Sequence, residues 1–187
     1  IALCLGGGVM AAWDVMDEIR LTSDTQYINF ANIPATYRDL VIIGSARNTY
    51  NNSYNAATLA MRINDNYANN VYPGGVFYHS GSQGGGASRN DVFAYAGLLC
   101  NEHSDTGAHS PIMLHFPNYT DSSNGQTWWS WAGRQPYRTS NSYGLSQHPW
   151  GWWTGTAAIT NIKFYSEATD YNIKAGSFFT MYGINEL

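Results

Sequence analysis

The residues of this chain that could do chemistry are few, and the densest group lies in the segment NEHSDTGAHS. It contains Glu102, His103, Asp105 and His109. Imidazoles and carboxylates are ligands of zinc and other divalent metals, so such a group could hold an ion. Its spacing fits no helix-borne metal motif, and the surrounding Ser, Gly and Asn are typical of a solvated turn. We interpret the segment as a polar loop, and we expect no metal and no cofactor.

Catalytic motifs are also missing from the sequence. A glycosidase needs two facing carboxylates, but the acidic residues Asp65, Asp91, Asp121 and Glu167 each fall at a predicted turn. The segment GSARN lacks the second glycine of a nucleophile elbow. The glycine-rich segments GGGVMA and GSQGGGAS lack the lysine and the helix of a phosphate loop. We expect a protein with no catalytic residues, not an enzyme.

Tryptophan is the unusual feature. Six of the seven tryptophans lie in one stretch, and with Tyr137 they are our candidate ligand-binding or interface aromatics: Trp128, Trp129, Trp131, Trp150, Trp152 and Trp153. Because successive residues of a strand face opposite sides, Trp129 and Trp131 should share a face that Trp128 does not, and Trp150 and Trp152 should lie opposite Trp153.

One face of this region should therefore be core, and two interpretations of the other face stay open. It is a subunit interface, since tryptophan is a large anchor with a polar handle. Alternatively it is a sugar-stacking platform, with hydrogen-bonding neighbours in Arg134, Gln135, Tyr137 and Asn141.

Composition favours an all-β protein with contact surfaces. Aromatic residues make up 15% of the 187 residues and charged residues only 12%, about half of the usual quarter. The net charge of −4, with nine scattered basic residues, gives no electrostatic basis for binding nucleic acid. The two cysteines, Cys4 and Cys100, are too few for a disulfide framework, and we interpret them as free thiols.

The hydrophobic pattern predicts about ten short strands and no amphipathic helix. In WDVMDEIRL, Val15 and Ile19 should share one face, and the apolar run Asp39 to Arg47 should lie in the middle of a sheet. Residues Gly81 to Asn90 should form a glycine-rich loop, and Asn124-Gly125 signals a hairpin. The last strand should turn Phe179 and Met181 to one side and Phe178, Thr180, Tyr182 and Ile184 to the other. The predicted fold is an all-β, antiparallel β-sandwich of jelly-roll type.

We expect an apolar N-terminal arm over residues 1–13 and a single sandwich domain over residues 14–187. The arm is too short to span a bilayer and lacks the basic region of a signal peptide. It needs burial, either against its own domain or against a neighbouring subunit, and we favour the neighbouring subunit. Its candidate interface residues are Ile1, Leu3, Leu5, Val9, Met10 and Trp13.

Four segments resemble landmarks of small virion structural proteins of marine and cyanobacterial tailed phages. They are INFANIPATYRDLVIIGSAR (28–47), MRINDNYANNVY (61–72), FPNYT (116–120) and the C-terminal AAITNIKFYSEATDYNIKAGSFFTMYGI, in the matching order. The resemblance covers residues 13 to 184 and implies a phage structural protein displayed on the particle, with no catalytic residues to transfer. The sequence departs from the group in its arm and in the tryptophan region.

These observations give two functional expectations. The first is a capsid decoration, or cement, protein bound on the major capsid protein of the virion as a homotrimer. The second is the tip of a tail fibre or spike that binds a host surface glycan through the tryptophan region. We expect no nucleic acid and no membrane among the partners.

Overall fold

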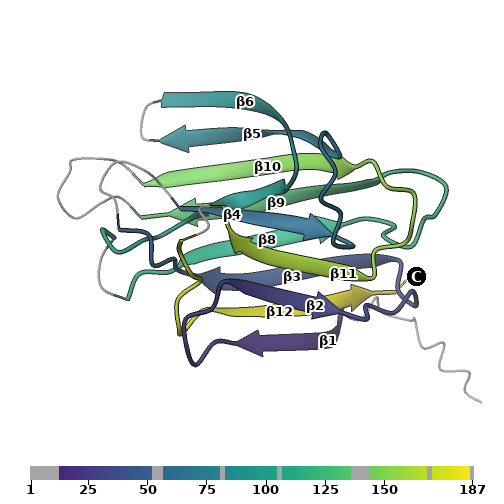
Figure 1. Ribbon diagram of the computed structural model, residues 1–187, viewed down its shortest axis with the longest axis horizontal. Coiled ribbons are helices and arrows are strands. Elements are labelled where there is room, and N and C mark those ends of the chain that lie inside the picture. Colours follow the sequence, from purple (N-terminus) through teal and green to yellow (C-terminus); the bar gives the residue numbers. More distant parts are fainter. Residues whose placement is uncertain are drawn as a thin grey trace, which may run out of the picture.

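Twelve antiparallel β-strands in two sheets make up the regular structure of the described residues (Figure 1). The structure is a computed structural model that describes residues 13–51, 57–80, 83–104, 107–135, 144–167 and 170–185. In spatial order, the eight-stranded sheet contains β1 (Trp13–Arg20), β12 (Phe178–Ile184), β3 (Asp39–Ala46), β8 (Ser110–Phe116), β9 (Gln126–Arg134), β10 (Leu145–Trp153), β5 (Tyr72–Ser80) and β6 (Gln83–Asp91). The four-stranded sheet contains β2 (Tyr27–Ala31), β11 (Asn161–Ser166), β4 (Ala57–Ile63) and β7 (Ala94–Leu99).

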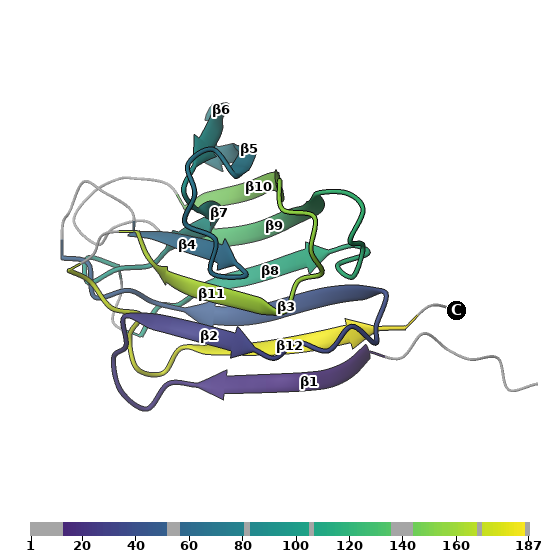
Figure 2. The same cartoon turned by 45° about the vertical axis from the view of Figure 1, so that its right-hand side comes forward.

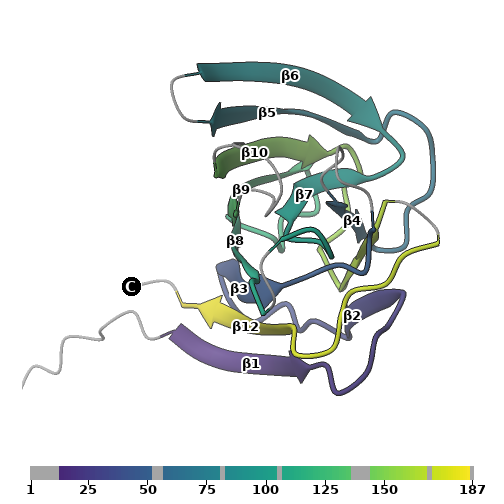
Figure 3. The ribbon, with the colours of Figure 1, turned by 90° about the vertical axis from the view of Figure 1, so that its left-hand side faces the viewer.

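The two sheets pack face to face, which confirms the predicted antiparallel β-sandwich. Figure 3 shows the smaller sheet lying against one side of the larger one. At one end of the large sheet, β5 and β6 extend beyond the small sheet (Figure 2). The division into eight and four strands does not by itself establish the predicted jelly-roll topology.

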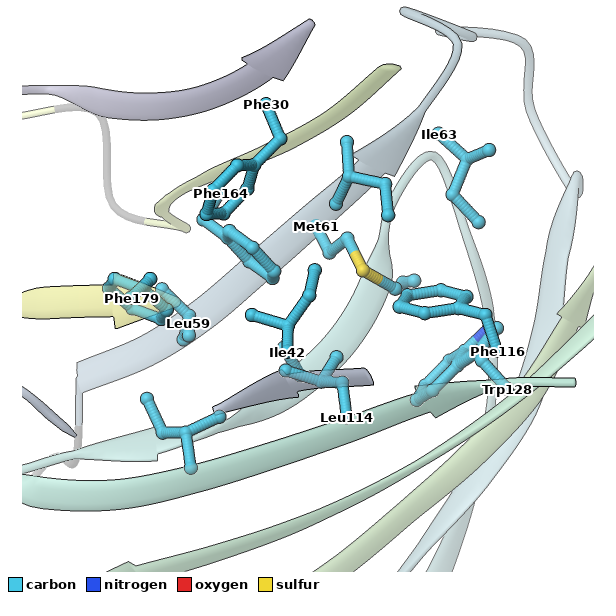
Figure 4. Packing of buried hydrophobic residues seen from close by; sticks show 14 of the residues in the cluster. Phe30, Ile42, Leu59, Met61, Ile63, Leu114, Phe116, Trp128, Phe164 and Phe179 are labelled. Atoms are coloured by element: carbon cyan, nitrogen blue, oxygen red, sulfur yellow. The ribbon is translucent and has the colours of Figure 1, made fainter. Parts of the chain in front are cut away.

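The core fills the space between the sheets. Figure 4 shows Ile42 and Leu114 of the large sheet facing Met61 and Phe164 of the small one. Phe164 also stacks on Phe179, with ring centroids 5.3 Å apart. These side chains are almost completely removed from water, so burial of apolar area is the main stabilising term of the fold.

The last strand lies inside the large sheet, next to its edge strand, and its two faces divide as the alternation predicts. β12 pairs with β1 on one side and β3 on the other. Phe179 and Met181 lie in the core, and Phe178 and Tyr182 lie on the other side of the strand, half-buried. Gly176 has a φ of 86° before the strand, a backbone conformation that favours glycine.

Two sequence predictions are wrong at the edges of the large sheet. In β1, the register shifts between Val15 and Asp17, so Val15 lies on the outer face while Ile19 packs against the core. A β-bulge of this kind breaks the period-two pattern from which their common face was predicted.

The second correction concerns the predicted glycine-rich loop at 81–90. Residues Gln83–Asp91 form β6, which pairs with β5 over its whole length. Glycine allows the close approach of a neighbouring side chain, because a Cβ on Gly85 would lie 2.5 Å from the Tyr78 hydroxyl oxygen. The sequence QGGGASRND has no apolar residue larger than alanine and therefore no clear hydrophobic alternation, so the pattern missed this strand.

Candidate functional site

The outer face of the large sheet carries a group of exposed aromatic side chains. Alternation in β9 and β10 turns Trp129, Trp131, Trp150 and Trp152 outward, each 41% to 56% exposed. Phe77 of β5, 61% exposed, joins them. We call these five residues the tryptophan face. Trp129 and Trp131 share a face, as predicted. Trp150 and Trp152 lie on the opposite side of β10 from Trp153, which was also predicted.

Strand register makes this face continuous across the sheet. Trp129 of β9 is paired with Trp150 of β10, and His148 of β10 with Phe77 of β5. Trp131 stacks on His148 with ring centroids 6.1 Å apart and planes at 14°. One register row crosses the sheet through Val15, Tyr182, Val41, His115, Trp129 and Trp150. The next crosses it through Glu18, Thr180, Ile43, Met113 and Trp131.

The indole N–H groups of Trp129 and Trp131 bond within the chain. Trp129 Nε1 donates to His115 Nδ1 at 2.9 Å, and Trp131 Nε1 donates to Ser146 Oγ at 3.2 Å. These indole N–H groups therefore have partners before any ligand arrives. What Trp129 and Trp131 leave toward solvent is ring surface, which is apolar contact area without an unused donor.

A buried carboxylate, that of Asp39, extends the same network. Asp39 Oδ2 lies 3.4 Å from His115 Nε2, and Asp39 also receives hydrogen bonds from the Arg38 side chain and from the Asn118 N–H. Because Nδ1 of His115 accepts the hydrogen bond from Trp129, the imidazole proton of His115 lies on Nε2, toward Asp39. Burial acts to raise the pKa of Asp39, but the Arg38 guanidinium, the Asn118 N–H and His115 outweigh it and leave the pKa below its usual value. Asp39 thus stays ionised and orients His115.

An apolar hollow of about 430 Å3 adjoins the tryptophan face. Its lining includes Pro111 and Met113 of β8, Trp131 of β9 and Ser146 of β10. A neighbouring hollow takes in Arg134 and Gln135 with Ser146. Two of the predicted hydrogen-bonding neighbours, Arg134 and Gln135, therefore lie beside the exposed tryptophans.

Two of the predicted contact tryptophans belong to the core instead. Trp128 and Trp153 are each 3% exposed and face the small sheet, so they offer no surface to a partner. Neither ring nitrogen has a hydrogen-bond partner among the described residues. The physical reason is the alternation itself, since every second residue of β9 and of β10 faces inward.

Of the remaining predicted contact residues, the structure describes some and not others. Trp13 is 46% exposed on the outer face of β1, where its ring lies 5.6 Å from that of Tyr182. Tyr137 and Asn141 lie outside the described residues, as do the arm residues Ile1, Leu3, Leu5, Val9 and Met10. The structure adds Phe77, Met113 and His148, which sequence reasoning missed; the alternation of β5 was the signal for Phe77.

The polar segment at 101–110 has structural partners. Glu102 forms an ion pair with Lys174, and His109 Nδ1 lies 2.9 Å from the Gly107 carbonyl oxygen. Across the described ranges, no three His, Cys, Asp or Glu side chains gather closely enough to hold a metal ion. Asp105 lies outside those ranges. Cys100 is a free, buried thiol beside Ser110 Oγ at 3.4 Å. No helix in the described part of the chain has the length and apolarity to cross a membrane.

Comparison of the chain with known protein families, with curated proteins and with solved structures found no match. The geometry of the tryptophan face therefore carries the functional argument.

Proposed function

We propose that this chain is a non-enzymatic structural protein of a tailed-phage virion, a decoration protein that docks on the major capsid protein through the tryptophan face. The sequence resemblance suggests the virion, and the outer face of the large sheet supplies the docking surface. The observation that carries the proposal is the row of exposed rings whose indole donors already bond within the chain at Trp129 and Trp131.

A protein surface is the occupant that best matches such a face. Contiguous exposed apolar patches on soluble proteins mark sites of association, and tryptophan is enriched among residues that dominate binding energy. The side chains of the two register rows from Val41 to Trp150 and from Ile43 to Trp131 include no Lys, Arg, Asp or Glu. A glycan would need hydrogen-bond donors and acceptors directed outward, which the two bonded indoles do not offer.

Burial of the face would supply the attachment energy. Apolar area stabilises a contact at roughly 25 cal/mol per Å2, before the cost of association is subtracted. Identical copies around a symmetry axis would add to one another through multivalency.

The first test is the copy number of this chain in purified virions, measured by quantitative mass spectrometry against the major capsid protein. A ratio near one copy per capsid subunit, or one trimer per capsomer junction, supports decoration. A ratio far lower than that overturns it and indicates a tail component.

A second test places the contact. Purified chain carrying Trp131→Ser and Trp152→Ser is added to capsids stripped of the native protein, and bound chain is measured by sedimentation. We expect binding to fall at least tenfold. The matched control is Tyr27→Ser, an aromatic residue 55% exposed on the opposite sheet, which should bind as the unchanged chain does. Equal binding by all three overturns the assignment of the tryptophan face.

A further inference from the structure

The outer face of the four-stranded sheet carries a groove of different chemistry. β2, β11 and β4 lie side by side there (Figure 1). In the strand register, Lys163 of β11 lies opposite Asn29 of β2 and opposite Arg62 of β4. The groove has a volume of about 640 Å3, within the roughly 300–1,000 Å3 of small-ligand sites. Its lining includes Tyr27, Arg62, Tyr67, Lys163, Tyr165 and Glu167. We call it the tyrosine groove. It lies on the side of the sandwich away from the tryptophan face.

Arg62 is the central cation of the groove. Its guanidinium carbon lies 4.1 Å from the centroid of the Tyr67 ring and 4.5 Å from that of the Tyr165 ring. The Nε atom donates to the Val92 carbonyl oxygen at 3.4 Å. Within the described ranges, no carboxylate lies at ion-pair distance from Arg62. A half-buried arginine that is held between two rings keeps its terminal N–H fork pre-organised for an anion.

This lack of a carboxylate partner stands out, because the second cation of the groove has one. Lys163 forms an ion pair with Asp65, and its ammonium lies 5.5 Å from the centroid of the Tyr27 ring. That carboxylate holds the pKa of Lys163 above its usual value. Arg62 is therefore the cation of this groove that remains for a ligand, in a chain whose net charge is −4.

The other groups of the groove suit a hydroxylated ring. Tyr27 and Tyr67 are 55% and 56% exposed and present ring surface, on which the C–H face of a sugar can stack. Glu167 lies exposed at the groove and can accept hydrogen bonds from hydroxyl groups. The Tyr165 hydroxyl is buried and has no hydrogen-bond partner among the described residues, and each such group calls for an explanation.

We propose that the tyrosine groove binds a carboxylate-bearing saccharide unit, with its carboxylate on Arg62, its ring against the tyrosines and its hydroxyl groups on Glu167. A simple phosphate or carboxylate ion would leave the ring surface and Glu167 without a role. The inference does not depend on the docking role of the tryptophan face, because the two surfaces lie on different sheets.

The test is titration calorimetry with two acidic sugars and their neutral counterparts: sialyllactose against lactose, and trigalacturonate against its methyl ester. We expect at least one acidic sugar to bind at least tenfold more tightly than its neutral counterpart, and more weakly as salt is added. Arg62→Met should abolish this difference. The control is Arg20→Met, which removes the same charge from an exposed arginine of the other sheet and should leave binding unchanged.

Arg62→Lys keeps a positive charge and guards against a failure of Arg62→Met to fold; it should still lose several-fold in affinity, since lysine lacks the planar fork. The proposal is overturned if no acidic sugar binds, if the acidic and neutral sugars bind equally, or if Arg62 and Arg20 variants weaken binding to the same degree. Virion copy number is unaffected by any of these outcomes, so failure here is distinguishable from failure of the decoration role.

Discussion

Substitution of two adjacent tryptophans in β9 by alanine should lower the free energy of unfolding by very different amounts. Trp128→Ala removes a side chain that is 3% exposed. A tryptophan buries about 150–250 Å2, which at roughly 25 cal/mol per Å2 gives about 4–6 kcal/mol as an upper bound, and measured losses for buried aromatic residues are about 3–5 kcal/mol. Trp129→Ala removes a side chain that is 42% exposed together with one hydrogen bond, for about 1–2 kcal/mol.

Urea unfolding followed by far-ultraviolet circular dichroism measures both free energies without relying on tryptophan emission. We expect Trp128→Ala to lose at least about 2 kcal/mol more than Trp129→Ala. In the capsid-binding assay the order should reverse, since Trp129 lies on the docking face. Trp128→Phe is the control: it keeps most of the ring and removes a buried N–H that has no partner among the described residues, so it should cost clearly less than alanine. Equal losses for the two alanine variants would refute the assignment of inward and outward faces.

Three further predictions concern the frame that supports these surfaces. Phe179→Ala, at a side chain that is 0% exposed, should lower the free energy of unfolding by about 3–5 kcal/mol in urea; a loss below about 1 kcal/mol contradicts its place in the core. Gly183→Ala would place a Cβ 2.3 Å from the Tyr37 ring and should lower Tm by several degrees, whereas Gly133→Ala meets only contacts of 3.5 Å and beyond and should not. Asp39→Asn should cost stability at pH 7 but progressively less as pH falls below about 4, because a carboxyl whose folded-state pKa is lowered stabilises the fold only while ionised; a gap in unfolding free energy that stays constant from pH 7 to pH 3 is the contrary result.

Features that depend on one strand alone were predictable from the sequence. The inward and outward tryptophans of β9, and Phe179 against Phe178 in β12, follow from period-two alternation with no knowledge of the neighbours. The run from Asp39 was predicted to lie inside a sheet because it lacks polar alternation, and β3 does pair with a strand on each side.

Features that depend on how strands meet were not predictable. The bulge in β1 between Val15 and Asp17 is set by its pairing with β12, and β6 is a strand because β5 lies beside it. The tyrosine groove shows the same limit, since Arg62 and Tyr165 are brought together only by the pairing of β4 with β11. Within either segment alone, neither residue has a partner that would mark it.

The position of β12 has a consequence for the order in which the chain folds. β1 lies at the edge of the large sheet and pairs with β12 alone, so it has no partner in the sheet until residues Phe178–Ile184 have left the ribosome. Contacts between segments so far apart in the sequence slow folding, because the loop between them must be ordered first. During synthesis, one edge of β3 and the apolar side chains of β1 stay exposed until β12 pairs with both strands. Nascent chains should therefore gain protease resistance in β1 only after synthesis has passed Ile184, and a chaperone that shields β1 until then would raise the yield of folded protein.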